Sequence, residues 1–207
     1  MSIDRTLAGR PGHNRGQTYP AEVLTADEVR ALMRATNRGN TGIRNRALIA
    51  VLYRAGLRLS EALALKPSDV DVDGGTIRVL HGKGDRARTV GLDHGAAALV
   101  GRWLDQRRNL GLNGRRRLFT KLDGSKWSPQ GVREMLKRAA AKAGIEKRVH
   151  PHGLRHTHAA ELAREGAPTN LIQAQLGHAS LAVTDRYLRH IAPRELVETI
   201  RRRAWDL

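Results

Sequence analysis

The chain has 207 residues, and its 37 Lys plus Arg outnumber its 20 Asp plus Glu, which gives a formal net charge of +17. This length suits one globular domain, and a hydrophobic fraction of 40% is enough for a packed core. Cysteine is absent, which excludes disulfides, thiolate catalysis, zinc–cysteine sites and iron–sulfur clusters. No apolar run of about 18 residues and no apolar signal region is present, so we expect a cytoplasmic protein without a membrane span.

The positive charge favours a polyanionic partner, with nucleic acid first and a membrane surface second. Aromatic residues make up only 3% of the chain, which argues against a sheet that stacks bases of single strands. A long basic amphipathic helix rich in Trp or Phe is also missing, which disfavours the membrane surface. The composition therefore favours a nucleic acid over a membrane surface.

Residues 1–20 combine glycine, proline and arginine and predict a flexible basic tail ahead of one domain over residues 21–207. Order begins with a capping box formed by Thr25 and Glu28. Helices are then predicted over about 43–55 and 61–65, with Gly56 ending the first in a left-handed conformation and Ser60 capping the second.

The periodicity changes to two over residues 76–80 and 86–90, which predicts a small antiparallel sheet with Lys83 at the tip of its hairpin. The rest of the chain has helical patterns. These lie over 96–108, after Ser128 and Pro129, and over 152–164, 169–176, 181–188 and 193–204. The predicted fold class is mainly α with a small antiparallel β-sheet, that is, α+β.

Histidines gather in the second half of the chain, in the segment HPHGLRHTH. His152 and His156 are four residues apart and could share a metal, but an HExxH pattern is absent and we expect no metal. For His150, His156 and His158 we expect structural roles, as helix caps or partners of buried carbonyls. His152 and Arg155 share a helix face, where a cation and an imidazole suit a phosphoryl oxygen.

Short motifs with Arg, Lys, His-x-x-Arg, His and Tyr follow one another in a fixed order. They are AGLRLSE, GKGDR, HGLR, LGH and TDRYL, with Arg58, Lys83, His152, Arg155, His178 and Tyr187 as their reactive residues. This set resembles the catalytic domain of the tyrosine recombinases, the phage-integrase and Xer family. The resemblance extends from about Thr25 to the end of the sequence and implies the tyrosine-recombinase catalytic-domain fold.

The resemblance implies strand cleavage through a covalent intermediate. Tyr187 would attack the scissile phosphorus and form a 3′-phosphotyrosine, which releases a 5′-hydroxyl and conserves the phosphodiester energy. Arg58 and Arg155 would neutralise the charge of the transition state, and His178 would donate a further hydrogen bond.

The remaining roles concern protons and orientation. Lys83 would protonate the leaving 5′-oxygen, and His152 would assist proton transfer at the tyrosine. Glu61 would orient Arg58 or His152. Since the arginines do the charge work that Mg²⁺ does in polymerases, we expect neither a metal nor another cofactor.

Further basic residues are candidates for contacts to the DNA backbone, with a solvated surface as the alternative. They are Arg86, Arg115, Arg116 and Arg117. The resemblance also implies double-stranded DNA as the partner and a homo-oligomer, a tetramer, on that DNA. The stripe over residues 193–204 could link protomers or pack against its own chain.

Most relatives carry a separate N-terminal core-binding domain, and we expect none here. The leading hypothesis is a site-specific recombinase acting in integration, excision or inversion on DNA of the nucleoid. The alternative is a DNA-binding module or accessory recombinase that depends on a partner recombinase and has weak or no catalysis of its own. A type IB topoisomerase or telomere resolvase is disfavoured by the short chain and the Xer-like motifs.

Overall fold

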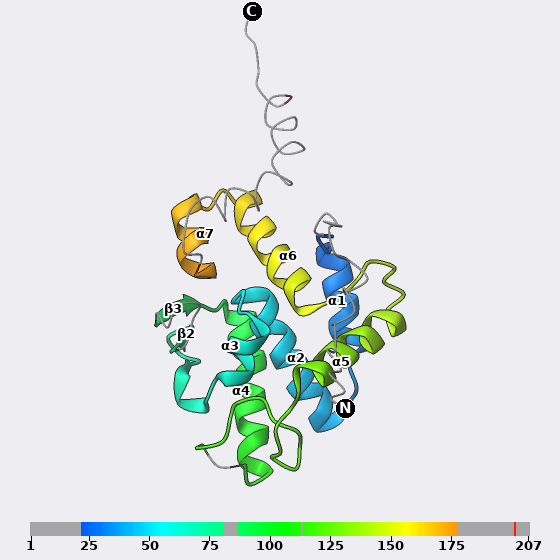
Figure 1. Ribbon diagram of the computed structural model, residues 1–207, viewed down its shortest axis with the longest axis vertical. Coiled ribbons are helices and arrows are strands. Elements are labelled where there is room, and N and C mark those ends of the chain that lie inside the picture. The colour runs from blue at the N-terminus through cyan, green and yellow to red at the C-terminus, as the bar shows by residue number, and fades with distance from the viewer. Residues whose placement is uncertain (1–21, 81–86, 113, 178–200, 202–207) are drawn as a thin grey trace, which may run out of the picture.

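The computed structural model describes residues 22–80, 87–112, 114–177 and 201 (Figure 1). Within them the chain forms helices and one small sheet, which confirms the predicted fold class. The elements are α1 (Ala26–Ala35), α2 (Gly39–Arg54), α3 (Leu59–Ala64), η1 (Pro67–Asp69), β1 (Val70–Asp71), β2 (Thr76–Val79), β3 (Arg88–Gly91), α4 (His94–Asn109), α5 (Pro129–Lys142), α6 (Pro151–Arg164) and α7 (Thr169–Leu176).

Helix α2 is the centre of the domain. Its residues from Ala47 to Tyr53 are all buried, so the helix is covered around its circumference rather than along one stripe. It packs against α4, α6 and α3, while α1 packs against α5 (Figure 1). Trp103 of α4 and Leu154 of α6 are fully buried in the same hydrophobic cluster. The C-terminal end of α2 is therefore held rigidly, and the turn that follows it starts from a fixed position.

The sheet has three antiparallel strands in the order β1-β2-β3. In its register Ile77 pairs with Val90 and Val79 pairs with Arg88. Residues that pair across strands point to the same face, and Ile77, Val79 and Val90 are all buried. The register therefore directs the side chain of Arg88 inward, on the core face of the sheet.

Most predicted helix ends are confirmed. Thr25 and Glu28 form the expected capping box, and Ser128 caps α5 with Pro129 in the first turn. Gly56 and Gly177 have φ values of 64° and 63°, the left-handed conformation expected at the ends of helices.

Some boundaries differ from the prediction. Helix α2 begins at Gly39 rather than near Ile43, and α3 begins at Leu59 with Arg58 as its N-cap rather than Ser60. The reason at α3 is Glu61, whose carboxylate accepts a hydrogen bond from the Arg58 backbone N–H at 2.9 Å and so starts the first turn two residues earlier than predicted. The predicted hairpin tip and the predicted helices over 181–188 and 193–204 lie outside the described residues, apart from the single position 201.

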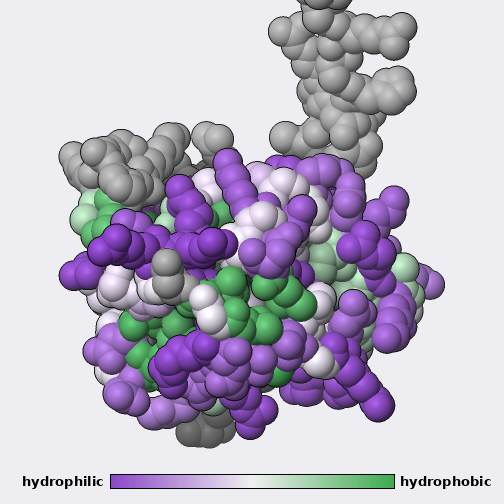
Figure 2. All heavy atoms as spheres, turned by 90° about the horizontal axis from the view of Figure 1, so that it is seen from below, coloured by the Kyte–Doolittle hydropathy of each residue, from purple (hydrophilic) through white to green (hydrophobic). Residues whose placement is uncertain are grey.

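The surface seen from the α4 end of the molecule is largely hydrophilic, with a smaller hydrophobic area between the polar side chains (Figure 2). Among the helices that the structure describes, none combines the length and the apolar character needed to cross a bilayer.

Candidate active site

The turn between α2 and α3 presents Arg58. Gly56 has a positive φ, and a Cβ at this position would lie 2.6 Å from Cδ2 of His158. Both facts favour glycine here. The turn reverses the chain so that Arg58 becomes the N-cap of α3, with its side chain 29% exposed.

Glu61 holds Arg58 from the first turn of α3. Glu61 is 4% exposed, and its carboxylate accepts hydrogen bonds from the Arg58 backbone N–H at 2.9 Å and from Arg58 Nη1 at 2.8 Å. Burial raises the pKa of Glu61, but the hydrogen bonds and charges of Arg88 and Arg58 outweigh it, so the pKa is lowered overall. Of the two partners considered for Glu61, the structure gives it Arg58.

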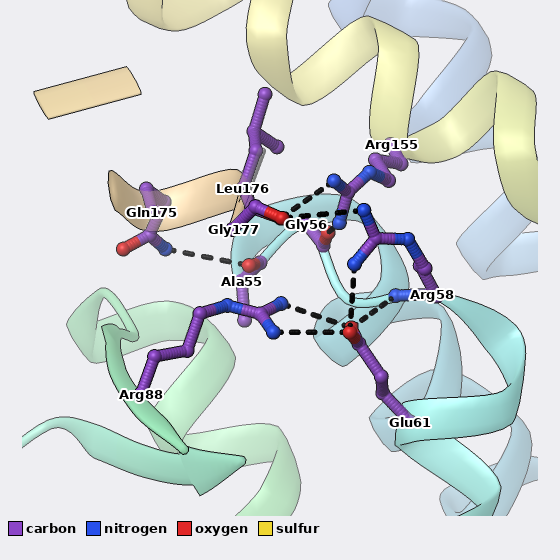
Figure 3. A network of polar contacts seen from close by, with 9 residues as sticks. All are labelled: Ala55, Gly56, Arg58, Glu61, Arg88, Arg155, Gln175, Leu176 and Gly177. Atoms are coloured by element: carbon purple, nitrogen blue, oxygen red, sulfur yellow. Dashed lines mark hydrogen bonds and ion pairs between the residues drawn. The ribbon is translucent and has the colours of Figure 1, made fainter. Parts of the chain in front are cut away.

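Arg155 comes to the same place from α6. It is 1% exposed and donates from Nη1 to the Gly56 carbonyl and from Nη2 to the Leu176 carbonyl, both at 2.6 Å. Arg58 donates from Nη2 to the next carbonyl, that of Gly177, at 3.3 Å. The two arginines, far apart in sequence, thus meet at the C-terminal end of α7 (Figure 3). His178 follows this end directly in the chain.

His152 lies one helical turn before Arg155, at the start of α6, and is exposed. Its ring meets that of His156 edge-on with centroids 4.2 Å apart. Although the residue is open to solvent on one side, the protein on its other side lowers the pKa of His152 by desolvation, and the charges of Arg155, His150 and Arg58 lower it further. The lowered pKa favours the neutral imidazole near neutral pH, and a neutral imidazole can accept a proton.

The other histidines have structural environments. His150 is the N-cap of α6, where Nδ1 accepts the Gly153 N–H at 3.0 Å. His158 is buried with no hydrogen bond to either ring nitrogen, so the expectation that it satisfies a buried carbonyl is wrong for this residue. Burial lowers the pKa of His158 to about 4, which keeps the ring neutral. No cluster of three metal-ligating side chains exists among the residues described here.

Arg88 is a member of the site that the sequence reasoning missed. Its Nη1 and Nη2 donate to the two oxygens of Glu61 at 3.0 and 2.9 Å, opposite Arg58 (Figure 3). The alternation of side chains along β3 could have indicated this position. Arg88 lies two residues before the buried Val90, so the two side chains must lie on the same face of the strand.

Gln175 is the second residue that was missed. Its Oε1 accepts the Gly91 N–H at 2.9 Å, and its Nε2 donates to the carbonyls of Gly91 at 2.9 Å and Ala55 at 3.3 Å. These bonds hold α7 against the end of β3. The bond to Ala55, which Figure 3 shows, also holds α7 against the end of α2. No sequence signal marks a glutamine for this task, because its partners are backbone groups.

Other candidates lie elsewhere. Lys83, Arg86, His178 and Tyr187 are outside the described residues. Arg115, Arg116 and Arg117 are exposed, and Arg117 donates to the Leu63 carbonyl near the far end of α3 from Arg58. The structure does not bring this triplet to the arginine pair.

A hollow of about 300 Å³ lies between the end of α1, the start of α2 and α5, and it shares no residue with the arginine pair. Arg44 lines it, 3.7 Å above the ring of Trp127, and donates to the Thr120 carbonyl at 3.2 Å. Burial lowers the pKa of Arg44 to about 10. Arg44 thereby anchors the segment between α4 and α5, which is a structural role.

The site as a whole is cationic. Arg58 and Arg88 bind the carboxylate of Glu61, and Arg155 binds backbone carbonyls beside them, so the network drawn in Figure 3 has three guanidinium groups, one carboxylate and a net charge of +2. Preorganised guanidinium donors of this kind bind the oxygens of a phosphate and stabilise charge that develops on them.

Comparison with known proteins identifies a family. The model of the phage integrase family matches residues 22–194, a range that includes Arg58, Glu61 and Arg155. The chain belongs to the phage integrase family. It is similar to the tyrosine recombinase XerD of Bifidobacterium longum, with 36% identity over 89% of this chain and 63% of XerD. It is also similar to the type 1 fimbriae regulatory protein FimE of Escherichia coli K12, with 37% identity over 83% of this chain and 87% of FimE.

A solved relative shares the fold. The XerH site-specific recombinase, in a post-cleavage complex with its palindromic difH substrate, superposes with a TM-score of 0.71 at 28% identity. The match covers 87% of this chain and 53% of XerH. This chain therefore spans about half to two thirds of the length of XerH and XerD, and most of the length of FimE.

Proposed function

We propose that this member of the phage integrase family is a site-specific DNA recombinase that cuts and rejoins strands through a 3′-phosphotyrosine. The observation that supports this best is the meeting of Arg58 and Arg155 at the end of α7, where both donate to consecutive backbone carbonyls. His178 follows Gly177 directly in the sequence, and in this proposal it supplies a third donor.

The chemistry follows from these groups. Attack on a phosphodiester gathers negative charge on its non-bridging oxygens, and fixed guanidinium donors stabilise that charge without rearranging. Arg58 and Arg155 supply these donors. His152, neutral near pH 7, assists proton removal from the attacking hydroxyl, and Lys83 protonates the leaving 5′-oxygen. The charge work needs no metal ion.

Tyr187 is the nucleophile in this proposal. The chain has three tyrosines, Tyr19, Tyr53 and Tyr187. Tyr53 is unsuitable because it is buried and its hydroxyl donates to Glu161 at 2.5 Å. Burial and this hydrogen bond raise the pKa of Tyr53, which disfavours the phenolate. The family match over residues 22–194 includes Tyr187 and leaves out Tyr19.

Double-stranded DNA is the proposed partner, in keeping with the net charge of +17 and with the palindromic difH substrate of XerH. Arg86, Arg115, Arg116 and Arg117 would contact its backbone outside the reacting phosphate. We also propose that residues 21–207 act as the catalytic domain after the basic tail 1–20. Several protomers would assemble on DNA in the cytoplasm through residues 193–204.

The test is an SDS gel of the protein with labelled, nicked DNA fragments from the regions that flank its own gene. Wild type should give a slower, protease-sensitive band, and Tyr187→Phe should give none while binding DNA within a few fold of wild type. EDTA should not change the yield. A gel shift without a covalent band from wild type would instead support the partner-dependent accessory role, and a band from Tyr187→Phe would reject this nucleophile.

A further inference from the structure

The pairing of β3 with β2 decides where Arg88 can reach. Arg88 lies opposite Val79, on the core face of the sheet, and its side chain is 13% exposed. From there it extends to α3 and meets Glu61 with both terminal nitrogens (Figure 3). A Cβ on Gly177 would lie 2.6 Å from Arg88 Nε, so the end of α7 lies directly against the Arg88 side chain.

The Glu61 carboxylate is fully engaged. A carboxylate has about four lone-pair positions, and Glu61 accepts four hydrogen bonds, two from Arg58 and two from Arg88. Each oxygen receives one bond from each arginine. Arg88 binds the carboxylate in the bidentate geometry that guanidinium and carboxylate groups favour. Arg88 therefore fixes the orientation of the carboxylate to which Arg58 is hydrogen-bonded.

The charges are as informative as the bonds. If Arg58 were the only partner of Glu61, the pair would be neutral and Arg58 would attract a phosphate weakly. With Arg88 present, two cations share one anion and the trio keeps a net charge of +1. In a site this buried, such a difference acts at short range with little screening by solvent.

We propose that Arg88 is a positioning residue of this site, which holds Glu61 in place and offsets its charge so that Arg58 stays fully cationic toward the reacting phosphate. The inference rests on the proposed function. It assigns a role in that reaction to a residue that acts through Glu61 and is not expected to touch the phosphate.

The first experiment measures covalent adduct formation at saturating DNA. Arg88→Gln should slow it about 10–100-fold, the range expected when one charge-assisted partner of a catalytic group is lost. DNA affinity should stay within about threefold of wild type. The matched control is Arg78→Gln on the adjacent strand, which removes the same charge from a side chain that is 60% exposed and should leave the rate unchanged. An Arg88→Gln rate equal to that of the control overturns the proposal.

The double variant Arg88→Gln with Glu61→Gln shows whether Arg88 acts through its charge or only supports the local structure. In Arg88→Gln the carboxylate of Glu61 neutralises Arg58, so adding Glu61→Gln should restore adduct formation at least threefold over the single variant. The added glutamine keeps an acceptor for Arg58 but carries no charge. A double variant that is as slow as the single variant, or slower, shows that Arg88 only supports the fold and overturns the charge argument.

A third measurement does not depend on catalysis and so distinguishes failure of this inference from failure of the proposed function. The titration of Glu61, followed by NMR of labelled protein, should move to higher pH in Arg88→Gln. The groups bonded to Glu61 are Arg58 on α3 and Arg88 on β3, α7 has no ionisable side chain, and those of α5 are exposed. An unchanged titration overturns the inference even if wild type forms no adduct.

Discussion

Gln175→Ala tests whether the end of α7 is held in place by backbone hydrogen bonds. The substitution removes three bonds, from the Gly91 N–H and to the carbonyls of Gly91 and Ala55. Two of them lie at an exposed position where water can replace them, so the loss should be about 1–2 kcal/mol rather than the sum of three buried bonds. For a domain of this size that corresponds to a fall in Tm of roughly 2–8 °C.

The same substitution should reduce adduct formation, because few apolar contacts remain to hold α7. Ile172 and Leu176 pack with Ala159 in a small cluster that is separate from the main core. The assay compares thermal unfolding and adduct rate for wild type, Gln175→Ala and a control, Gln130→Ala. The control loses one exposed bond to Glu134 on α5, a loss of less than about 0.5 kcal/mol. Equal stability and equal rates for the two variants would refute the reasoning.

Other predictions concern α6. Because the pKa of His158 is lowered to about 4, the unfolded state binds the extra proton, so stability is complete above about pH 6.5 and falls toward pH 4, by on the order of 3 kcal/mol. In His158→Leu the free energy of unfolding, measured by urea denaturation, should depend less on pH over this range. The same pH dependence in wild type and variant would contradict the assignment. His150→Ala should cost about 1 kcal/mol through loss of the cap to Gly153, and His150→Asn should retain it. In Arg155→Lys the single ammonium group cannot bind both carbonyls as the two guanidinium nitrogens do, so adduct formation should fall about 100-fold. A rate near that of wild type would contradict this role.

The helical part of the fold could be predicted because local signals agreed with the packing. The capping box at Thr25, Ser128 with Pro129, and the left-handed glycines Gly56 and Gly177 all lie where the pattern placed them. The start of α3 was predicted two residues too late, because Ser60 is a common type of N-cap residue. In the structure the N-cap is Arg58, and the Glu61 side chain accepts a hydrogen bond from its backbone N–H.

The candidate site was predictable only in part. Arg58, Arg155 and Glu61 were found through motif resemblance, and the structure brings them together. Arg88 depends on the register of two strands, which sequence alternation suggests but does not fix. Gln175 bonds to backbone groups of distant elements, and such partners leave no pattern in a single sequence.

The most direct measurement is identification of the residue that becomes joined to DNA. The adduct is digested with nuclease and trypsin, and the nucleotide-bearing peptide is sequenced by mass spectrometry. We predict that the nucleotide is attached to Tyr187, in the tryptic tripeptide Tyr187-Leu188-Arg189. Attachment to Tyr19, or DNA cleavage without any peptide-linked nucleotide, would contradict the proposed mechanism.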